Sequence, residues 1–241
     1  MRLSTLATVV AASTAAYAAP SALVLGQWSP LRSLPGEVCR WRGPRTARVA
    51  LTFDDGPAEP STPRILDRLG VLGLRATFFC VGELVDRNPT LVREILRRGH
   101  QVETHGHRHL HHLARSPRWV RSDLDAAVDA LGRAGVRPRW FRPSYGQMTA
   151  ATVLASRTHG LKTVLWSAWG REWTTTDHRD VVARVSRRLG EGAIVLLHDT
   201  DASSPPGTAA VVERALGPLA EELERRGLEA VTLDALLGAA A

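Results

Sequence analysis

Two adjacent carboxylates, Asp54 and Asp55, are the first residues of this 241-residue chain whose type and spacing suit catalysis. They end the apolar run 47–53, and successive side chains of an extended backbone point to opposite sides. The two carboxylates can therefore take two roles in one site, one binding a metal ion while the other transfers protons. The alternative interpretation is an ordinary turn, because the sequence Asp-Gly-Pro at 55–57 favours a turn on its own.

A pair of histidines, His105 and His109, has the spacing of metal ligands. Four residues apart, they would lie on one turn of a helix and bring both imidazoles to a single ion. A histidine-rich surface loop has the same pattern, since further histidines crowd this segment. Two neutral imidazoles and one carboxylate leave open positions on Zn²⁺, which is typical of a catalytic site, where the metal lowers the pKa of its water and polarises a carbonyl.

The segments that must position these residues alternate between short β-rich runs and longer runs of helical periodicity. We expect seven strands, at Ala47–Phe53, Ala76–Val81, Gln101–Thr104, Trp140–Arg142, Leu161–Trp166, Ala193–Leu197 and Leu228–Leu233. We expect six helices, at Pro63–Leu72, Thr90–Arg98, Pro117–Ala134, Ala150–His159, Arg179–Leu189 and Thr208–Arg226. The alternation predicts a mostly parallel α/β sheet, and seven strands favour a single-domain barrel of the (β/α) type over an open sheet. No Gly-x-Gly-x-x-Gly sequence follows the first strand, so the usual sign of a dinucleotide site is missing.

Polar and ionisable residues lie at the carboxyl ends of five predicted strands, where the active sites of (β/α) barrels form. The segments are 54–57, His105, 142–146, 166–173 and 198–199. Hydrolysis of an acyl group needs a base, an oxyanion stabiliser and an acid, which Asp54, the loop at Tyr145 and His198 can supply. Arg142 can hold Asp54 ionised through a bidentate contact.

Composition places the chain among folded proteins, because 44% of its residues are hydrophobic. The net charge of +7 comes from 31 basic against 24 acidic residues, and Lys162 is the only lysine. These charges are scattered over predicted helix faces, so we expect no nucleic-acid partner. An anionic cell wall or membrane surface remains a candidate for association.

The first residues resemble an export signal, with Arg2, an apolar stretch and an Ala-x-Ala cleavage site at 16–18. We predict a signal peptide or membrane anchor over residues 1–19, with an uncleaved anchor reaching about Leu25 as the alternative. Residues 20–46 are predicted to be a linker, and 47–236 a catalytic domain. We therefore expect a secreted or cell-envelope protein, with a cytoplasmic location left open, and a monomer.

Four motifs in chain order resemble those of the polysaccharide deacetylases, the NodB-homology domains of carbohydrate esterase family 4. They are Thr52-Phe53-Asp54-Asp55-Gly56-Pro57, Gly99-His100 with His105-x-x-x-His109, Arg142-Pro143-Ser144-Tyr145-Gly146, and Leu196-Leu197-His198-Asp199. The resemblance covers about residues 47 to 236. It implies a distorted (β/α) barrel that removes N-acetyl or O-acetyl groups from a glycan such as peptidoglycan, a chitin-like polymer or xylan. It also implies a divalent metal, usually Zn²⁺, with Co²⁺ or Ni²⁺ as alternatives.

The same resemblance assigns a role to each motif residue. The metal ligands would be Asp55, His105 and His109. Asp54 would be the general base, oriented by Arg142, and His198 the general acid. The backbone N–H of Tyr145 would face the oxyanion.

The chain departs from the family pattern at two positions. Gly106 stands where a Ser or Thr normally steadies the metal loop. Trp169 aligns with an Asp that normally pairs with the catalytic histidine, and Glu172, three residues on, can take over that contact. We also count Trp169, Glu172 and Trp173 as candidate substrate-binding residues, because indole rings can stack on sugars. The altered motif keeps open a second hypothesis, a catalytically impaired carbohydrate-binding pseudoenzyme.

Overall fold

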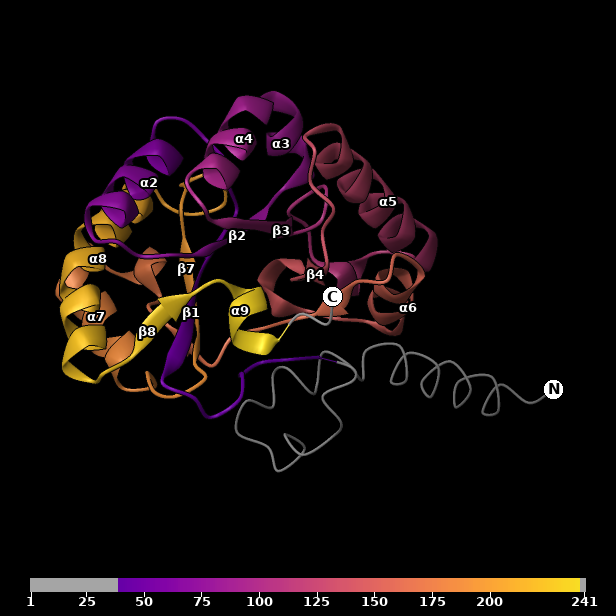
Figure 1. The fold of residues 1–241 in the computed structure, drawn as a ribbon. Helices are drawn as coiled ribbons and strands as arrows, with labels where there is room; N and C mark the ends of the chain where they lie inside the picture. The colour runs from indigo at the N-terminus through magenta and orange to yellow at the C-terminus, as the bar shows by residue number, and fades with distance from the viewer. Residues whose placement is uncertain (1–38, 239–241) are drawn as a thin grey trace.

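The computed structural model describes residues 39–238 as a curled parallel sheet surrounded by helices (Figure 1). The strands are β1 (Arg48–Asp54), β2 (Thr77–Cys80), β3 (Gln101–Thr104), β4 (Trp140–Phe141), β5 (Lys162–Thr163), β6 (Ala168–Trp169), β7 (Ile194–His198) and β8 (Glu229–Val231). The α-helices are α2 (Ser61–Val71), α3 (Gly82–Arg87), α4 (Pro89–Arg97), α5 (Pro117–Arg133), α6 (Ala150–Thr158), α7 (His178–Ser186), α8 (Thr208–Arg225) and α9 (Leu233–Leu237). Seven strands follow the order β5-β4-β3-β2-β1-β7-β6, and β8 pairs with β1 off this path. The predicted distorted (β/α) barrel is confirmed.

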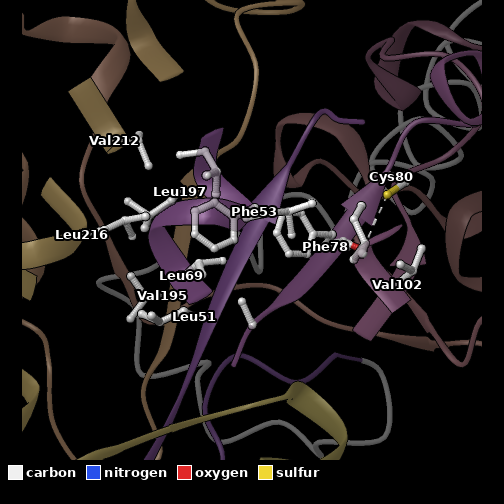
Figure 2. Close-up of a cluster of buried hydrophobic side chains, with 14 of the residues drawn as sticks. Leu51, Phe53, Leu69, Phe78, Cys80, Val102, Val195, Leu197, Val212 and Leu216 are labelled. Carbon is white, nitrogen blue, oxygen red and sulfur yellow. Dashed lines mark hydrogen bonds between the residues drawn. The ribbon is translucent and has the colours of Figure 1, made fainter. Parts of the chain in front are cut away.

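The side chains of the central strand β1 point alternately to the two faces of the sheet. Its residues Val49, Leu51 and Phe53 belong to the core beneath the helices, where Phe53 stacks on Phe78 with ring centroids 5.1 Å apart. Figure 2 shows this core, in which Leu197 of β7 and Leu216 of α8 also take part. Because side chains alternate along a strand, Asp54 points to the opposite side, into the barrel.

The register of the sheet brings the functional strand ends together. Asp54 at the end of β1 pairs with His198 at the end of β7, and Thr104 of β3 pairs with Phe141 of β4. Parallel strands end at the same edge, so residues that are far apart in the chain meet at one end of the barrel.

The segment before β1 pairs with the barrel on two sides. Arg40 forms a parallel bridge with Val164, and Arg42 an antiparallel bridge with Ala193. The described end of the predicted linker, residues 39–46, therefore lies against the sheet. The predicted signal peptide or anchor, residues 1–19, lies outside the described residues. Among residues 39–238, no helix is long and apolar enough to span a membrane.

The expected elements differ from the structure in three places. We expected the run Leu161–Trp166 to be one strand, but only β5 forms there, because its partner β4 is followed by Pro143, which has no N–H to continue the ladder. The separate strand β6 was not predicted. Neither were the short helices α3 and α9, whose five or six residues are too few to show helical periodicity.

Candidate active site

Asp54 is held by a buried arginine at the end of β1. Its side chain is 3% exposed, and Nη1 of the fully buried Arg142 lies 2.7 Å from Asp54 Oδ1. The same Nη1 donates to the Thr52 hydroxyl at 2.8 Å, while Nη2 donates to the Leu165 carbonyl at 3.1 Å. The expected bidentate contact is therefore wrong: Arg142 makes one hydrogen bond to Asp54, through Nη1, because Nη2 donates to the Leu165 carbonyl instead. Asp54 Oδ2 is left facing the site.

Asp55, His105 and His109 converge as the sequence predicts. Asp55 has a left-handed backbone, with φ of 80°, which carries its carboxylate to the same site as that of Asp54. Its Oδ1 lies 3.3 Å from Nε2 of each histidine. The three ligand atoms are within 4.8 Å of one another.

The donor set fits a divalent cation. Asp55 Oδ1 is buried and has no hydrogen-bond partner among residues 39–238, so a cation would satisfy it. Burial opposes ionisation of Asp55, but the neighbouring imidazoles of His105, His198 and His109 hold the pKa of this carboxyl below its usual range. Burial lowers the pKa of His109 to about 4, so its imidazole is neutral and able to ligate at neutral pH.

The two predicted histidine ligands lie in a loop, and the expectation that they share a helical turn is wrong. Gly106 has φ of 88°, which breaks the helical path between them. Asp123 of α5, 6% exposed, accepts the backbone N–H groups of His107 at 3.0 Å and Arg108 at 3.1 Å. The buried carboxylate thus steadies the loop where the family hydroxyl at position 106 is missing. In the sequence, the only signal for this role of Asp123 is its position on the helix face that is expected to be buried.

His198 is paired with Glu172. His198 Nδ1 lies 2.9 Å from Glu172 Oε1, and the Glu172 side chain is completely buried. Burial alone would lower the pKa of His198, but the hydrogen bond and charge of Glu172, with Asp55 and Asp54, raise it to about 9. The alternative contact expected from sequence is therefore present. The placement of Glu172 among substrate-binding residues is wrong, because it lies beneath His198 with no exposed surface.

Tyr145 lies beside the predicted metal ligands, in the loop after β4. Its backbone has φ of 59° and its side chain is 48% exposed. The phenol ring lies 4.4 Å from the imidazole of His109, measured between centroids. The geometry therefore places this loop beside the ligand set, as the resemblance implies.

Three tryptophans form a series of ring contacts that begins at His198. The Trp173 ring meets the His198 imidazole edge-on at 5.4 Å, Trp169 lies 5.8 Å from Trp173, and Trp166 lies 5.8 Å from Trp169. Trp166 is 9% exposed and belongs to the barrel core. Trp169 and Trp173 are only partly buried, so their rings are accessible to a ligand at the rim.

Asp199 packs against the turn that follows Asp55, at Gly56. Its buried carboxylate accepts a hydrogen bond of 2.5 Å from the Thr62 hydroxyl of α2. A Cβ at position 56 would collide with this carboxylate, so Gly56 permits the close approach. Burial raises the pKa of Asp199 to about 7. The sequence placed this residue at a strand end and in the last family motif, but assigned it no role.

Comparison with known proteins agrees with this geometry. The polysaccharide deacetylase family model matches residues 42–164. The chain belongs to this family. It is 33% identical over 201 residues to a peptidoglycan-N-acetylglucosamine deacetylase of Bacillus cereus, covering 82% of this chain and 92% of the relative.

Two solved structures of the family share the fold. A peptidoglycan N-acetylglucosamine deacetylase in complex with 4-naphthalen-1-yl-N-oxidanyl-benzamide has a TM-score of 0.81 at 28% identity, covering 88% of this chain and 99% of that one. A carbohydrate esterase family 4 pseudoenzyme from Bacillus anthracis has a TM-score of 0.75 at 25% identity, covering 86% and 70%. Because the fold holds both kinds of protein, activity must be argued from the residues present.

Deacetylases of this family use a divalent metal, and the cluster of Asp55, His105 and His109 suits that requirement. The ligands and the Asp54–Arg142 and Glu172–His198 pairs lie at one end of the barrel. His105 joins these groups, since its Nε2 is 3.8 Å from Asp54 Oδ2.

Proposed function

We propose that this chain is an active metal-dependent deacetylase that hydrolyses the acetamido group of N-acetylglucosamine residues in a glycan. The observation that carries the proposal is the joint presence of a base, a ligand set and an acid: Asp54 with Arg142, the Asp55 cluster, and His198 with Glu172. The names of the Bacillus cereus relative and the first solved structure support an N-acetylated cell-wall glycan as substrate.

In the proposed reaction, water attacks the carbonyl carbon of the acetamide and the carbon–nitrogen bond breaks, giving acetate and a free amine. Asp54 Oδ2 takes the proton of the attacking water, because Oδ1 is occupied by Arg142. The Tyr145 backbone N–H donates to the carbonyl oxygen as negative charge develops there. His198 gives its proton to the leaving nitrogen, and its raised pKa keeps that proton available at neutral pH.

Asp55, His105 and His109 would hold the metal, and two imidazoles with one carboxylate suit Zn²⁺, with Co²⁺ or Ni²⁺ as substitutes. A bound divalent metal would supply Lewis-acid polarisation of the carbonyl and a water of lowered pKa.

We further propose that the chain is exported, since an acetylated wall glycan lies outside the cytoplasm, and that it works as a monomer. Trp169 and Trp173 would contact the sugar beside His198, because their partly exposed rings line that side of the site. The excess of basic residues would favour retention on an anionic wall or membrane surface.

The test is acetate release from chitooligosaccharides and from acetylated xylan, with and without chelator, together with the metal content of the protein. Asp54→Asn should abolish release while metal stays bound, and Asp86→Asn, a surface carboxylate paired with Arg133, is the matched control. Release that both chelator and Asp54→Asn abolish supports the proposal. Bound metal with no release from any glycan would establish the pseudoenzyme hypothesis instead. A preference for xylan would overturn the N-acetyl assignment.

A further inference from the structure

Two loops of the site are joined by a stack of aromatic rings. The imidazole of His105 stacks on that of His109, with centroids 5.3 Å apart. The centroid of the Tyr145 ring lies 4.4 Å from that of His109. The His111 imidazole stacks on the Tyr145 ring, with centroids 3.6 Å apart and an angle of 11° between the ring planes. Tyr145 thus contacts both a predicted metal ligand and a histidine that has no role in the reaction proposed above.

His111 is itself fixed by the loop that it covers. It is exposed, and an exposed histidine without partners would change rotamer freely. Here its Nδ1 lies 2.9 Å from Oε1 of Gln147, two residues after Tyr145, so Nδ1–H donates to the amide oxygen. A second link joins the same loops, because the Ser144 hydroxyl donates to the His105 carbonyl at 3.4 Å.

The segment held in this way carries a strained backbone. Tyr145 has φ of 59° and ψ of 10°, a left-handed conformation that bulky residues seldom adopt. Such a conformation persists where the surroundings enforce it. The Tyr145 backbone N–H lies in the peptide plane before this residue, whose orientation to the Tyr145 side chain is set by φ, so contacts that hold Tyr145 in this conformation help to fix where that donor points.

We propose that His111 is a positioning residue: stacked on Tyr145 and anchored by Gln147, it keeps the Tyr145 backbone N–H aimed at the developing oxyanion. The catalytic part of this inference rests on the proposed deacetylase function. His111 touches neither substrate nor metal, and it acts by coupling the loop of the histidine ligands to the loop of the oxyanion donor. His111, one of the further histidines near the predicted ligands, therefore serves the site without ligating.

A kinetic test of this proposal compares the variants His111→Ala, His111→Phe and Gln147→Leu with the native protein. Removing one oxyanion donor typically costs about 10²–10³ in kcat, and a displaced donor should cost less, so we expect His111→Ala to lower kcat by about ten- to a hundred-fold with KM little changed. His111→Phe keeps the stack and should recover most of kcat, and Gln147→Leu should fall between. His178→Ala, a partly exposed histidine on α7, is the matched control and should behave like the native protein.

A second measurement tests whether His111 holds the Tyr145 loop, and it does not require enzyme activity. In the full chain, amide hydrogen exchange of residues 144–147 should rise about ten-fold in His111→Ala, while β1 and β7 keep their protection. Native-like exchange in this segment would overturn the proposal. So would a His111→Ala enzyme with native kcat, or a His111→Phe enzyme as slow as His111→Ala. If the native protein releases no acetate, the proposed function fails, and the exchange result alone decides whether His111 holds the loop.

Discussion

Replacing Glu172 by Gln would test whether its charge sets the protonation of His198. The two side chains have the same shape, so the hydrogen bond of 2.9 Å to His198 Nδ1 can persist while the negative charge is lost. Glu172 is completely buried, so the charge that His198 meets is little screened by water. The substitution should therefore lower the pKa of His198 and leave its orientation unchanged.

The size of this pKa shift follows from the free energies of hydrogen bonds, which differ by about 1–1.5 kcal/mol between a charged and a neutral partner. This corresponds to about one pKa unit. The pKa of His198 is raised to about 9 in the native protein, so the acid form is present at pH 7 and is lost as the pH rises through 9. In Glu172→Gln the loss should occur about one unit lower, which predicts nearly native activity at pH 7 and roughly five-fold lower activity at pH 9.

The assay is the pH dependence of kcat/KM for acetate release from a chitooligosaccharide between pH 6 and 10, at saturating metal. The alkaline limb of this profile reports the general acid in the free enzyme. Glu221→Gln, an exposed carboxylate on α8, is the control and should leave the limb in place. An unshifted limb in Glu172→Gln would refute the assigned role, and an equal loss of rate at every pH would show that Glu172 acts through geometry alone.

Two further substitutions test the supports of the ligand set. Asp123→Ala removes the acceptor for two loop N–H groups and should weaken metal affinity about ten-fold, measured by competition with a chelator. Asp129→Ala, on the exposed side of the same helix, is its control, and equal affinities would contradict the argument. Gly56→Ala puts a methyl group against Asp199 and should destabilise the fold by about 1–3 kcal/mol in thermal unfolding. Gly70→Ala, where the new Cβ meets nothing within 4 Å, should not, and a native melting temperature for Gly56→Ala would exclude the clash.

The central strands and the residues at their ends could be predicted because local pattern and barrel geometry agree there. Residues 49, 51 and 53 of β1 alternate with residues that face the barrel, and that period is visible in the sequence. Once parallel strands are assumed, Asp54 and His198 must end at the same edge, and the observed register pairs them directly. Residues that are distant in the chain could be grouped without any view of side-chain contacts.

Elements that depend on pairing with a distant segment could not be predicted. The run Leu161–Trp166 is uniformly apolar or β-branched apart from Lys162, so its sequence suits one continuous strand. Its strand ends at Thr163 because β4 is followed by Pro143, and Val164 pairs on its other edge with Arg40, more than 120 residues earlier. No local property of either segment indicates that contact, and β-propensity is known to depend on such context.

The two departures from the family pattern show why a motif position is a weaker guide than the contact it normally makes. A comparison by position finds Trp169 where an acid is expected, yet the left-handed Arg171, with φ of 51°, begins a turn that brings Glu172 under His198. Gly106 likewise lacks the expected hydroxyl, and Asp123 binds the loop from a helix instead. In both cases the chemical requirement is a buried acceptor at a given point in space. Residues from elsewhere in the chain can meet it, so the altered motif does not by itself predict loss of activity.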